Sequence, residues 1–226
     1  MQPFQTILIC QGAEYQAVCR GLSRASGTLP SAIAIPVGRN SLTYLHEKFE
    51  SKKELPSSVL VMGLCGSLTP RYTVGDILLY RDCIYQGSLL SCDRTLTAQL
   101  ASHLQTEAFL VTALTSDRVI CHAAEKRHLA QTSGADVVDM EGFGILEFFR
   151  QLGVAVAILR VVSDDCYHDV PDLTPALNDG SLQPLPLAIA MLRQPLAATR
   201  LIRGAMLGLK VLEQVTTSLF ELKIKT

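Results

Sequence analysis

Three short stretches carry the residues whose types and spacing could do chemistry. Segment 60–67 (LVMGLCGS) ends in glycines and a serine, segment 137–142 (VVDMEG) holds two acids, and segment 158–165 (ILRVVSDD) ends in a serine and two aspartates. In open α/β sheets, ligands bind beyond the carboxyl ends of strands. Acids at two strand ends could form one acidic pocket, with a glycine-rich turn that lets backbone approach a ligand closely.

Each stretch also has a purely structural interpretation. Gly63 and Gly66 could have no role beyond making a tight turn. Glu141 could favour a helix N-terminus through the helix dipole, and Ser163 with Asp164 could be a helix N-cap pair. The residue pattern alone leaves these alternatives open.

The elements that must position these residues follow from hydrophobic periodicity. Short apolar runs predict strands at 6–10, 31–37, 57–63, 76–85, 108–115, 135–140 and 154–163. Longer amphipathic segments predict helices at 14–25, 41–49, 95–105, 122–131 and 142–152, and two more within 183–222. Strands that alternate with helices and read as continuous apolar runs predict an α/β fold with helices on both faces of the sheet.

Composition bounds the class of protein. The chain has 226 residues, of which 48% are hydrophobic, and no linker or repeat divides it, so we expect one domain over 1–226 with a helical extension at about 183–222. A formal charge of −1 argues against a nucleic-acid binder. Seven dispersed cysteines predict reduced, mostly buried thiols and a cytoplasmic location, and the first ten residues lack the features of a signal peptide.

Several catalytic motifs do not occur in the sequence. It has no G-x-x-x-x-G-K-[ST], no G-x-G-x-x-G, no H-E-x-x-H and no G-x-S-x-G. These absences weaken the cases for a P-loop NTPase, a dinucleotide enzyme, a zinc protease and a serine hydrolase.

Taken together, VMGLCGSLTPRYTVGDILLY, GADVVDMEGFGIL and ILRVVSDD resemble the nucleoside phosphorylase/nucleosidase superfamily, in order and spacing, over about residues 5–170. The resemblance implies a three-layer αβα sandwich with a central mixed sheet. It also implies cleavage of a purine N-glycosidic bond without a metal or organic cofactor, and a homo-oligomer. Segment 164–215 is similar to the hopanoid-associated phosphorylase branch, whose members are implicated in removing adenine from adenosylhopane.

The resemblance assigns roles to two acids and their neighbours. Breaking the bond passes through an oxocarbenium-like ribose, and the base must not leave as a bare anion. Asp164 is expected to protonate purine N7, a role that needs an acid tuned by its pocket. Glu141 is expected to accept hydrogen bonds from the ribose hydroxyls. Met140 would pack against the ribose, and Ser163 would orient Asp164 or touch the base.

Small and apolar residues would line the purine pocket. Val119 and Ile120 match the family segment that reads the base edge, while Cys65 and Gly66 would face the base from the other side. Asp139, unlike Glu141, is expected to be structural.

The attacking group is harder to assign. Phosphorolytic relatives hold phosphate with arginines and a serine near the glycine-rich turn, where this chain has Val61 and Leu64. The nucleosidases activate water with an N-terminal glutamate; Glu14 is nearby, but an ungapped match puts Ala17 at that position. Arg39 is a candidate phosphate contact or an ordinary surface arginine.

Three hypotheses follow for function. We favour phosphorolysis of an adenine nucleoside, with inorganic phosphate as co-substrate and a hopanoid-linked nucleoside among the candidate substrates. Hydrolysis is the close alternative, and a non-catalytic nucleoside-binding protein is the third.

The C-terminal segment bears on partners. Residues 193–226 contain six basic and two acidic residues, an excess of four positive charges. Such a leucine-rich helix could contact a membrane surface that carries a lipid-linked substrate, which would make the protein peripheral to the membrane. The more common role of such a helix is to pack on the core or at a subunit interface.

Overall fold

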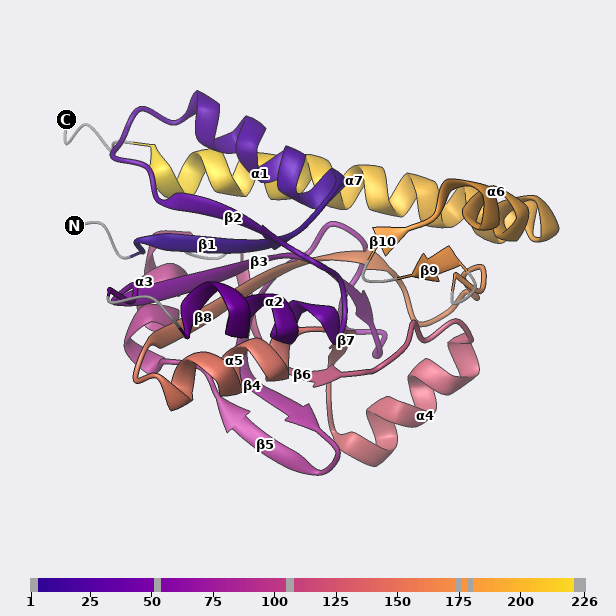
Figure 1. Ribbon diagram of the computed structural model, residues 1–226. Coiled ribbons are helices and arrows are strands. Elements are labelled where there is room, and N and C mark those ends of the chain that lie inside the picture. The colour runs from indigo at the N-terminus through magenta and orange to yellow at the C-terminus, as the bar shows by residue number, and fades with distance from the viewer. Residues whose placement is uncertain (1–3, 51–53, 105–107, 174–175, 179–180, 222–226) are drawn as a thin grey trace.

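The computed structural model describes residues 4–50, 54–104, 108–173, 176–178 and 181–221 (Figure 1). The elements follow in the order β1 (Thr6–Cys10), α1 (Ala13–Arg24), β2 (Ser31–Ile35), α2 (Asn40–Phe49), β3 (Ser58–Ser67), β4 (Ile77–Tyr85), β5 (Ser88–Ser91), α3 (Arg94–Leu104), β6 (Ala108–Thr115), α4 (Ala123–Ser133), β7 (Val137–Asp139), α5 (Gly142–Gln151), β8 (Ala155–Asp164), β9 (Leu177–Asn178), β10 (Ser181–Leu182), α6 (Pro184–Arg193) and α7 (Pro195–Phe220).

One mixed sheet forms the centre of the molecule. Its strand order is β2-β1-β3-β7-β6-β4-β5, and β8 pairs with both β3 and β4. The pairings β3–β8, β8–β4, β4–β6, β6–β7 and β7–β3 therefore close a ring, from which β1, β2 and β5 extend. This closure brings the carboxyl ends of β3 and β8 next to the short strand β7.

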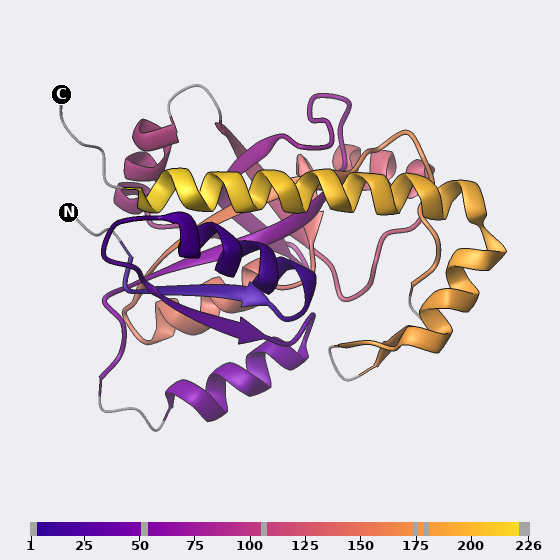
Figure 2. The same ribbon diagram turned by 90° about the horizontal axis from the view of Figure 1, so that it is seen from above.

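Helices cover both faces of the sheet, as the sequence predicts for continuous apolar strands. On one side α1, α3 and α7 pack Val18, Leu100 and Leu212 into a core with strand residues such as Ile7. On the other side α2 and α5 supply the core residues Leu45, Phe49, Phe143, Ile145 and Phe149. Figures 1 and 2 both show α1 lying alongside α7. The expected α/β class with a mixed central sheet is confirmed.

The predicted elements mostly have the observed type, with two kinds of difference. The strand predicted to end at Gly63 continues to Ser67, so both glycines lie inside β3. The short strands β5, β9 and β10 were not predicted, because pieces of two to four residues leave no periodic signal.

The long helix α7 crosses the carboxyl end of β8 at close range. A side chain at Gly204 would overlap the carbonyl oxygen of Ser163, and one at Gly208 would come within 2.9 Å of Leu64. These two glycines, one turn apart, let the helix backbone lie almost directly on the strand. Among the residues that the structure describes, no helix is both long and apolar enough to cross a membrane.

All seven cysteines are unpaired. Six of them are buried and Cys19 is partly exposed, in agreement with the expected buried thiols.

Candidate active site

Two glycines of β3 make room for charged side chains. A Cβ at Gly63 would overlap the Arg160 guanidinium and the Glu14 carboxylate, and a Cβ at Gly66 would lie 2.8 Å from an Asp164 oxygen. Gly63 pairs with Arg160, and Gly66 with Asp164, in the register of β3 and β8. The glycines are therefore required by close approach inside a strand, and not by a tight turn.

Three carboxylates share one buried guanidinium beside Gly63. Arg160 lies 3.4 Å from Asp139, 3.3 Å from Glu141 and 3.9 Å from Glu14, measured between side-chain nitrogen and oxygen. The Arg160 side chain is only 1% exposed, and a buried charge needs ionic partners. We call these four residues the Arg160 cluster.

One cation cannot fully compensate two buried acids and the partly exposed Glu14, and the pKa values of the cluster reflect this. Burial raises the pKa of Glu14 from 4.5 to about 7; Arg160 opposes the rise and Glu141 adds to it. Burial also raises the pKa of Glu141, again against Arg160 and with the help of Asp139. Near neutral pH the cluster can therefore take up or release a proton at Glu14.

Glu141 is not used as a helix cap. It occupies the N-cap position of α5 but makes no capping hydrogen bond. Its Oε1 instead accepts a 2.8 Å hydrogen bond from the backbone N–H of Gly38, in the loop after β2. A Cβ on Gly38 would lie 3.5 Å from the Met140 methyl carbon, so this loop covers both Met140 and Glu141.

Asp139 makes the local structural contacts. Its Oδ1 accepts hydrogen bonds from the Thr115 hydroxyl at 2.8 Å and from the Gly142 N–H at 3.2 Å. It thereby joins the end of β6 to the start of α5, in keeping with the structural role predicted for it.

Glu14 lies in the first turn of α1, and its side chain reaches the Arg160 cluster. An ungapped alignment with the nucleosidases would instead assign this position to Ala17. The Glu14 Oε2 accepts a 3.1 Å hydrogen bond from the Leu64 N–H. Ala17, the residue that the ungapped match puts in this role, is buried in the core beneath α1. One further turn of helix thus separates the aligned position from the residue whose side chain enters the site.

Asp164 has a cation of its own. The ammonium of Lys126, on α4, pairs with its carboxylate and also donates a 2.8 Å hydrogen bond to the carbonyl of Asp165. The Ser163 hydroxyl lies 2.9 Å from Asp164 Oδ1 and 3.2 Å from the Cys65 carbonyl. Lys126 and Ser163 therefore hold the Asp164 carboxyl from two sides.

The residues expected to line the purine pocket have mixed surroundings. Gly66 faces Asp164 directly, but the Cys65 side chain is buried in the core, with only its carbonyl turned to Ser163. Ile120 packs with Leu68 and Val138, and Val119 is partly exposed on the same loop. Contact of Val119, Ile120 and Cys65 with a base remains a prediction.

Arg39 lies in an exposed ion pair. Its Nε and Nη2 donate to the Asp117 carboxylate at 2.9 and 2.7 Å, and the Tyr85 hydroxyl lies 3.0 Å from the same carboxylate. This pair links the loops after β2 and β6 to the end of β4. Arg39 would have to leave Asp117 before Arg39 could hold a phosphate. This ion pair favours the interpretation of Arg39 as a surface arginine.

Sequence reasoning missed two of the central residues. A local signal existed for Arg160, which is the one charged residue in the apolar run 154–163 and so needed a buried partner. Lys126 gave none, because it belongs to an ordinary polar helix and its partner is 38 residues away. In the described ranges no three His, Cys, Asp or Glu residues are grouped to hold a metal ion.

Comparisons with known proteins define the class. The sequence matches the Phosphorylase superfamily over residues 13–178. The chain therefore belongs to this superfamily. A search of curated proteins found no match.

Solved structures with the same fold include three nucleoside-cleaving proteins. The apo 5′-methylthioadenosine nucleosidase of Arabidopsis thaliana is 15% identical, with a TM-score of 0.67 and coverage of 96% of this chain and 95% of that one. The 5′-methylthioadenosine/S-adenosylhomocysteine nucleosidase of S. pneumoniae, bound to a transition-state inhibitor, is 15% identical, with a TM-score of 0.63 and coverage of 95% of this chain and 98% of that one. The futalosine hydrolase of Helicobacter pylori is 15% identical, with a TM-score of 0.62 and coverage of 93% of this chain and 95% of that one.

Proposed function

We propose that the protein hydrolyses the N-glycosidic bond of an adenine nucleoside. Glu14 takes a proton from the attacking water, Glu141 holds the ribose hydroxyls, and Asp164 protonates the departing base at N7. The observation that carries the proposal is the position of Glu14, a carboxyl with a pKa of about 7 in the same cluster as Glu141.

A base is most effective when its pKa lies near the working pH, because it is then both available and basic enough to accept a proton. The ordinary glutamate value of 4.5 would make Glu14 a weak base for water. Burial beside Glu141 and Asp139 supplies the difference. Attack forms the bond from the water oxygen to C1′ while the bond from C1′ to N9 breaks and its electron pair passes to the base.

The base also needs a proton as it leaves. Asp164 passes its proton to N7, and the ammonium of Lys126, which pairs with this carboxyl group, stabilises the negative charge left on it. After turnover Asp164 regains a proton from solvent and Glu14 loses one to it, which restores the starting state. The Ser163 hydroxyl keeps the carboxyl oriented.

The distribution of cations supports water over phosphate. Arg160, Lys126 and Arg39 are each paired with at least one carboxylate. A phosphate dianion beside Glu14 and Glu141 would meet two acids that share one guanidinium, and like charges in a buried site repel strongly. The resemblance in sequence favoured phosphorolysis, whereas this charge arrangement favours hydrolysis.

The test is to incubate the protein with adenosine, 5′-methylthioadenosine and an adenosine with an apolar 5′ extension, with and without inorganic phosphate. Adenine release at equal rates in both buffers supports hydrolysis, and release only with phosphate contradicts it in favour of phosphorolysis. Binding without release of adenine from any of the three would leave a nucleoside-binding protein. The extended nucleoside tests whether a lipid-linked substrate is preferred.

The pH profile tests the role of Glu14 separately. Since the base must be ionised, kcat/KM should fall as pH drops below about 7. Glu14→Gln should lose most of the activity while adenine binding survives. An acidic limb that persists unchanged in this variant would assign it to another group.

A further inference from the structure

The C-terminal helices carry an unusual density of exposed apolar side chains. The members are large aliphatic residues or methionine on α6 and the first half of α7: Leu185, Ile189, Leu192, Leu196, Ile202, Met206 and Leu207. Leu192 and Leu196, on either side of the bend between the helices, are 79% and 75% exposed. We call these residues the α6–α7 surface.

The surface also has charge of one sign. Residues 183–212 contain Arg193, Arg200, Arg203 and Lys210 and no aspartate or glutamate. All four cations are exposed. On α7 they alternate with the apolar residues, so that long basic side chains surround the hydrophobic positions.

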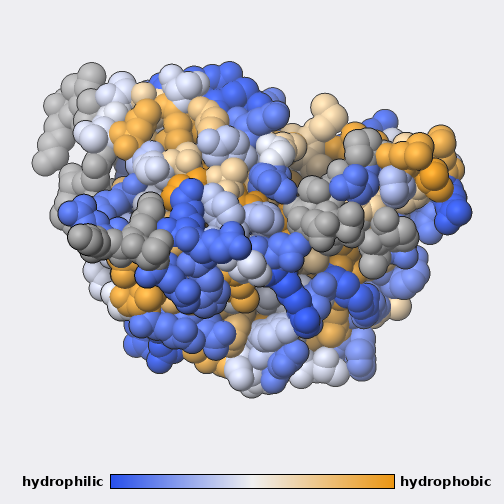
Figure 3. All heavy atoms as spheres, in the orientation of Figure 1, coloured by the Kyte–Doolittle hydropathy of each residue, from blue (hydrophilic) through white to orange (hydrophobic). Residues whose placement is uncertain are grey.

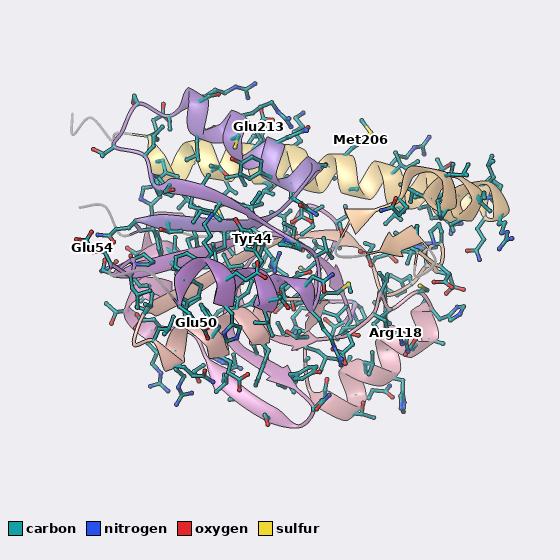
Figure 4. The ribbon with its side chains drawn as sticks, viewed as in Figure 1. Tyr44, Glu50, Glu54, Arg118, Met206 and Glu213 are labelled. Carbon is teal, nitrogen blue, oxygen red and sulfur yellow. The ribbon has the colours of Figure 1, made fainter. Side chains whose placement is uncertain are left out.

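The opposite side of α7 is already occupied. Ala198, Gly204, Gly208 and Leu212 are buried against the body of the protein. Figure 4 shows Met206 pointing away from that body, and Figure 2 shows α6 standing off from the sheet beyond the start of α7. The apolar residues are therefore not the rear of a core.

Figure 3 shows the same end of the molecule as a mixture of hydrophobic and hydrophilic residues. A helix with exposed leucines and isoleucines among arginines and lysines suits the boundary of a bilayer. There the apolar side chains enter the acyl region, and the cations extend to the phosphates.

We propose that the α6–α7 surface docks the protein on an anionic lipid bilayer. The two helices lie in the plane of the interface, with Leu192 and Leu196 as the central insertion and the four cations on the headgroups. Each cation near an anionic leaflet adds to the attraction, and the absence of acids means that nothing in 183–212 opposes it.

The charge of the α6–α7 surface favours a lipid bilayer over a second copy of the chain as its partner. A twofold interface sets the same patch against itself. Here it would bring four cations against four, with no acid from 183–212 to pair with them, and such contacts are costly. A bilayer with anionic lipid complements both properties of the surface.

Docking would also place the site close to the membrane. Gly204 contacts the Ser163 carbonyl from the buried side of α7, while Met206 lies on the outer side of the same helix. One helix, about 10 Å thick, thus separates Ser163 from the lipid surface.

The test is cosedimentation of the full chain with vesicles of phosphatidylcholine alone or of phosphatidylcholine with phosphatidylglycerol. We expect binding to the anionic vesicles, weakened by salt, and at least about tenfold weaker binding to neutral ones. Leu192→Ser with Leu196→Ser should weaken binding about tenfold or more, as should Arg200→Glu with Arg203→Glu.

The controls are Leu89→Ser with Phe109→Ser, two exposed apolar residues on β5 and β6 that lie outside the α6–α7 surface, and a charge reversal, Arg150→Glu, at the far end of α5. These should bind like the parent chain, and thermal melts of all variants should coincide. The proposal is overturned if the chain fails to bind the anionic vesicles, or if the control variants lose as much vesicle binding as the variants of the α6–α7 surface. A stable dimer that Leu196→Ser dissociates also overturns it, because the surface would then be a subunit interface.

Discussion

Arg160 and Lys126 are both buried cations at the carboxyl-end side of the sheet, but they serve different numbers of acids. Arg160 lies among Glu14, Asp139 and Glu141, whereas Lys126 meets the single carboxylate of Asp164. Burial raises the pKa of Glu14, with the help of Glu141 and against the effect of Arg160, whereas Lys126 and Asp164 form a one-to-one ion pair. Under the proposed function, the first arrangement supplies the group that accepts a proton and the second holds the carboxyl that donates one.

Asp164→Asn should have the largest effect on that division. An amide cannot donate the proton to N7, so kcat should fall about 10³-fold while the KM for the nucleoside changes little. The measurement is adenine release under saturating substrate. Asp165→Asn, which alters the neighbouring acid that contacts His168, is the control and should retain nearly full activity. Unchanged kcat in Asp164→Asn would remove it from the general-acid role.

Arg160→Met should destabilise the Arg160 cluster. The buried Asp139 and Glu141 and the partly exposed Glu14 would lose their shared cation, and the free energy of unfolding should drop by about 3–5 kcal/mol at pH 8. Chemical denaturation measures this loss. Adding Glu14→Gln should recover part of it, because one uncompensated charge is removed; a strictly additive double variant would mean that the two residues do not interact.

Lys126→Met tests the matched pair. It leaves the Asp164 carboxylate without its cation, so we expect a loss in kcat of about 10²-fold. Lys126→Arg keeps the positive charge and should recover most of the stability and part of the rate, since the planar guanidinium does not reproduce the position of the ammonium. Equal activities for the methionine and arginine variants would show that the positive charge at residue 126 does not assist turnover.

The effect of Glu14→Gln on stability should be the smallest of these changes, and it should be an increase. The pKa of Glu14 is raised in the folded protein from 4.5 to about 7, so the penalty on folding grows as the pH rises from 4.5 to about 7 and is complete above that range. Glutamine removes that penalty, and the variant should be about 2–3 kcal/mol more stable at pH 8. At pH 4, where both side chains are neutral, the two proteins should unfold alike. A gain that does not depend on pH would contradict a titrating Glu14.

The sequence predicted the longer elements well because each of them leaves a local signal. The apolar run 154–163 and the amphipathic segment 142–152 correspond to β8 and α5. It also placed Asp164, Glu141, Ser163 and Gly66 in one region by the order of their motifs. Arg39 shows the limit of such reasoning, since an arginine beside a loop glycine looks the same whether its partner is a phosphate or Asp117.

What the sequence determined by itself is the α/β class, the superfamily and the acids at strand ends, because periodicity and motif spacing are properties of the chain. The tertiary structure decided which groups meet. It closed the sheet through β8, set the Arg160 guanidinium above Gly63, chose Glu14 over Ala17 and gave Asp164 a lysine from a distant helix. Proton affinities depend on burial and on charges within a few ångströms, and those distances exist only after the chain has folded.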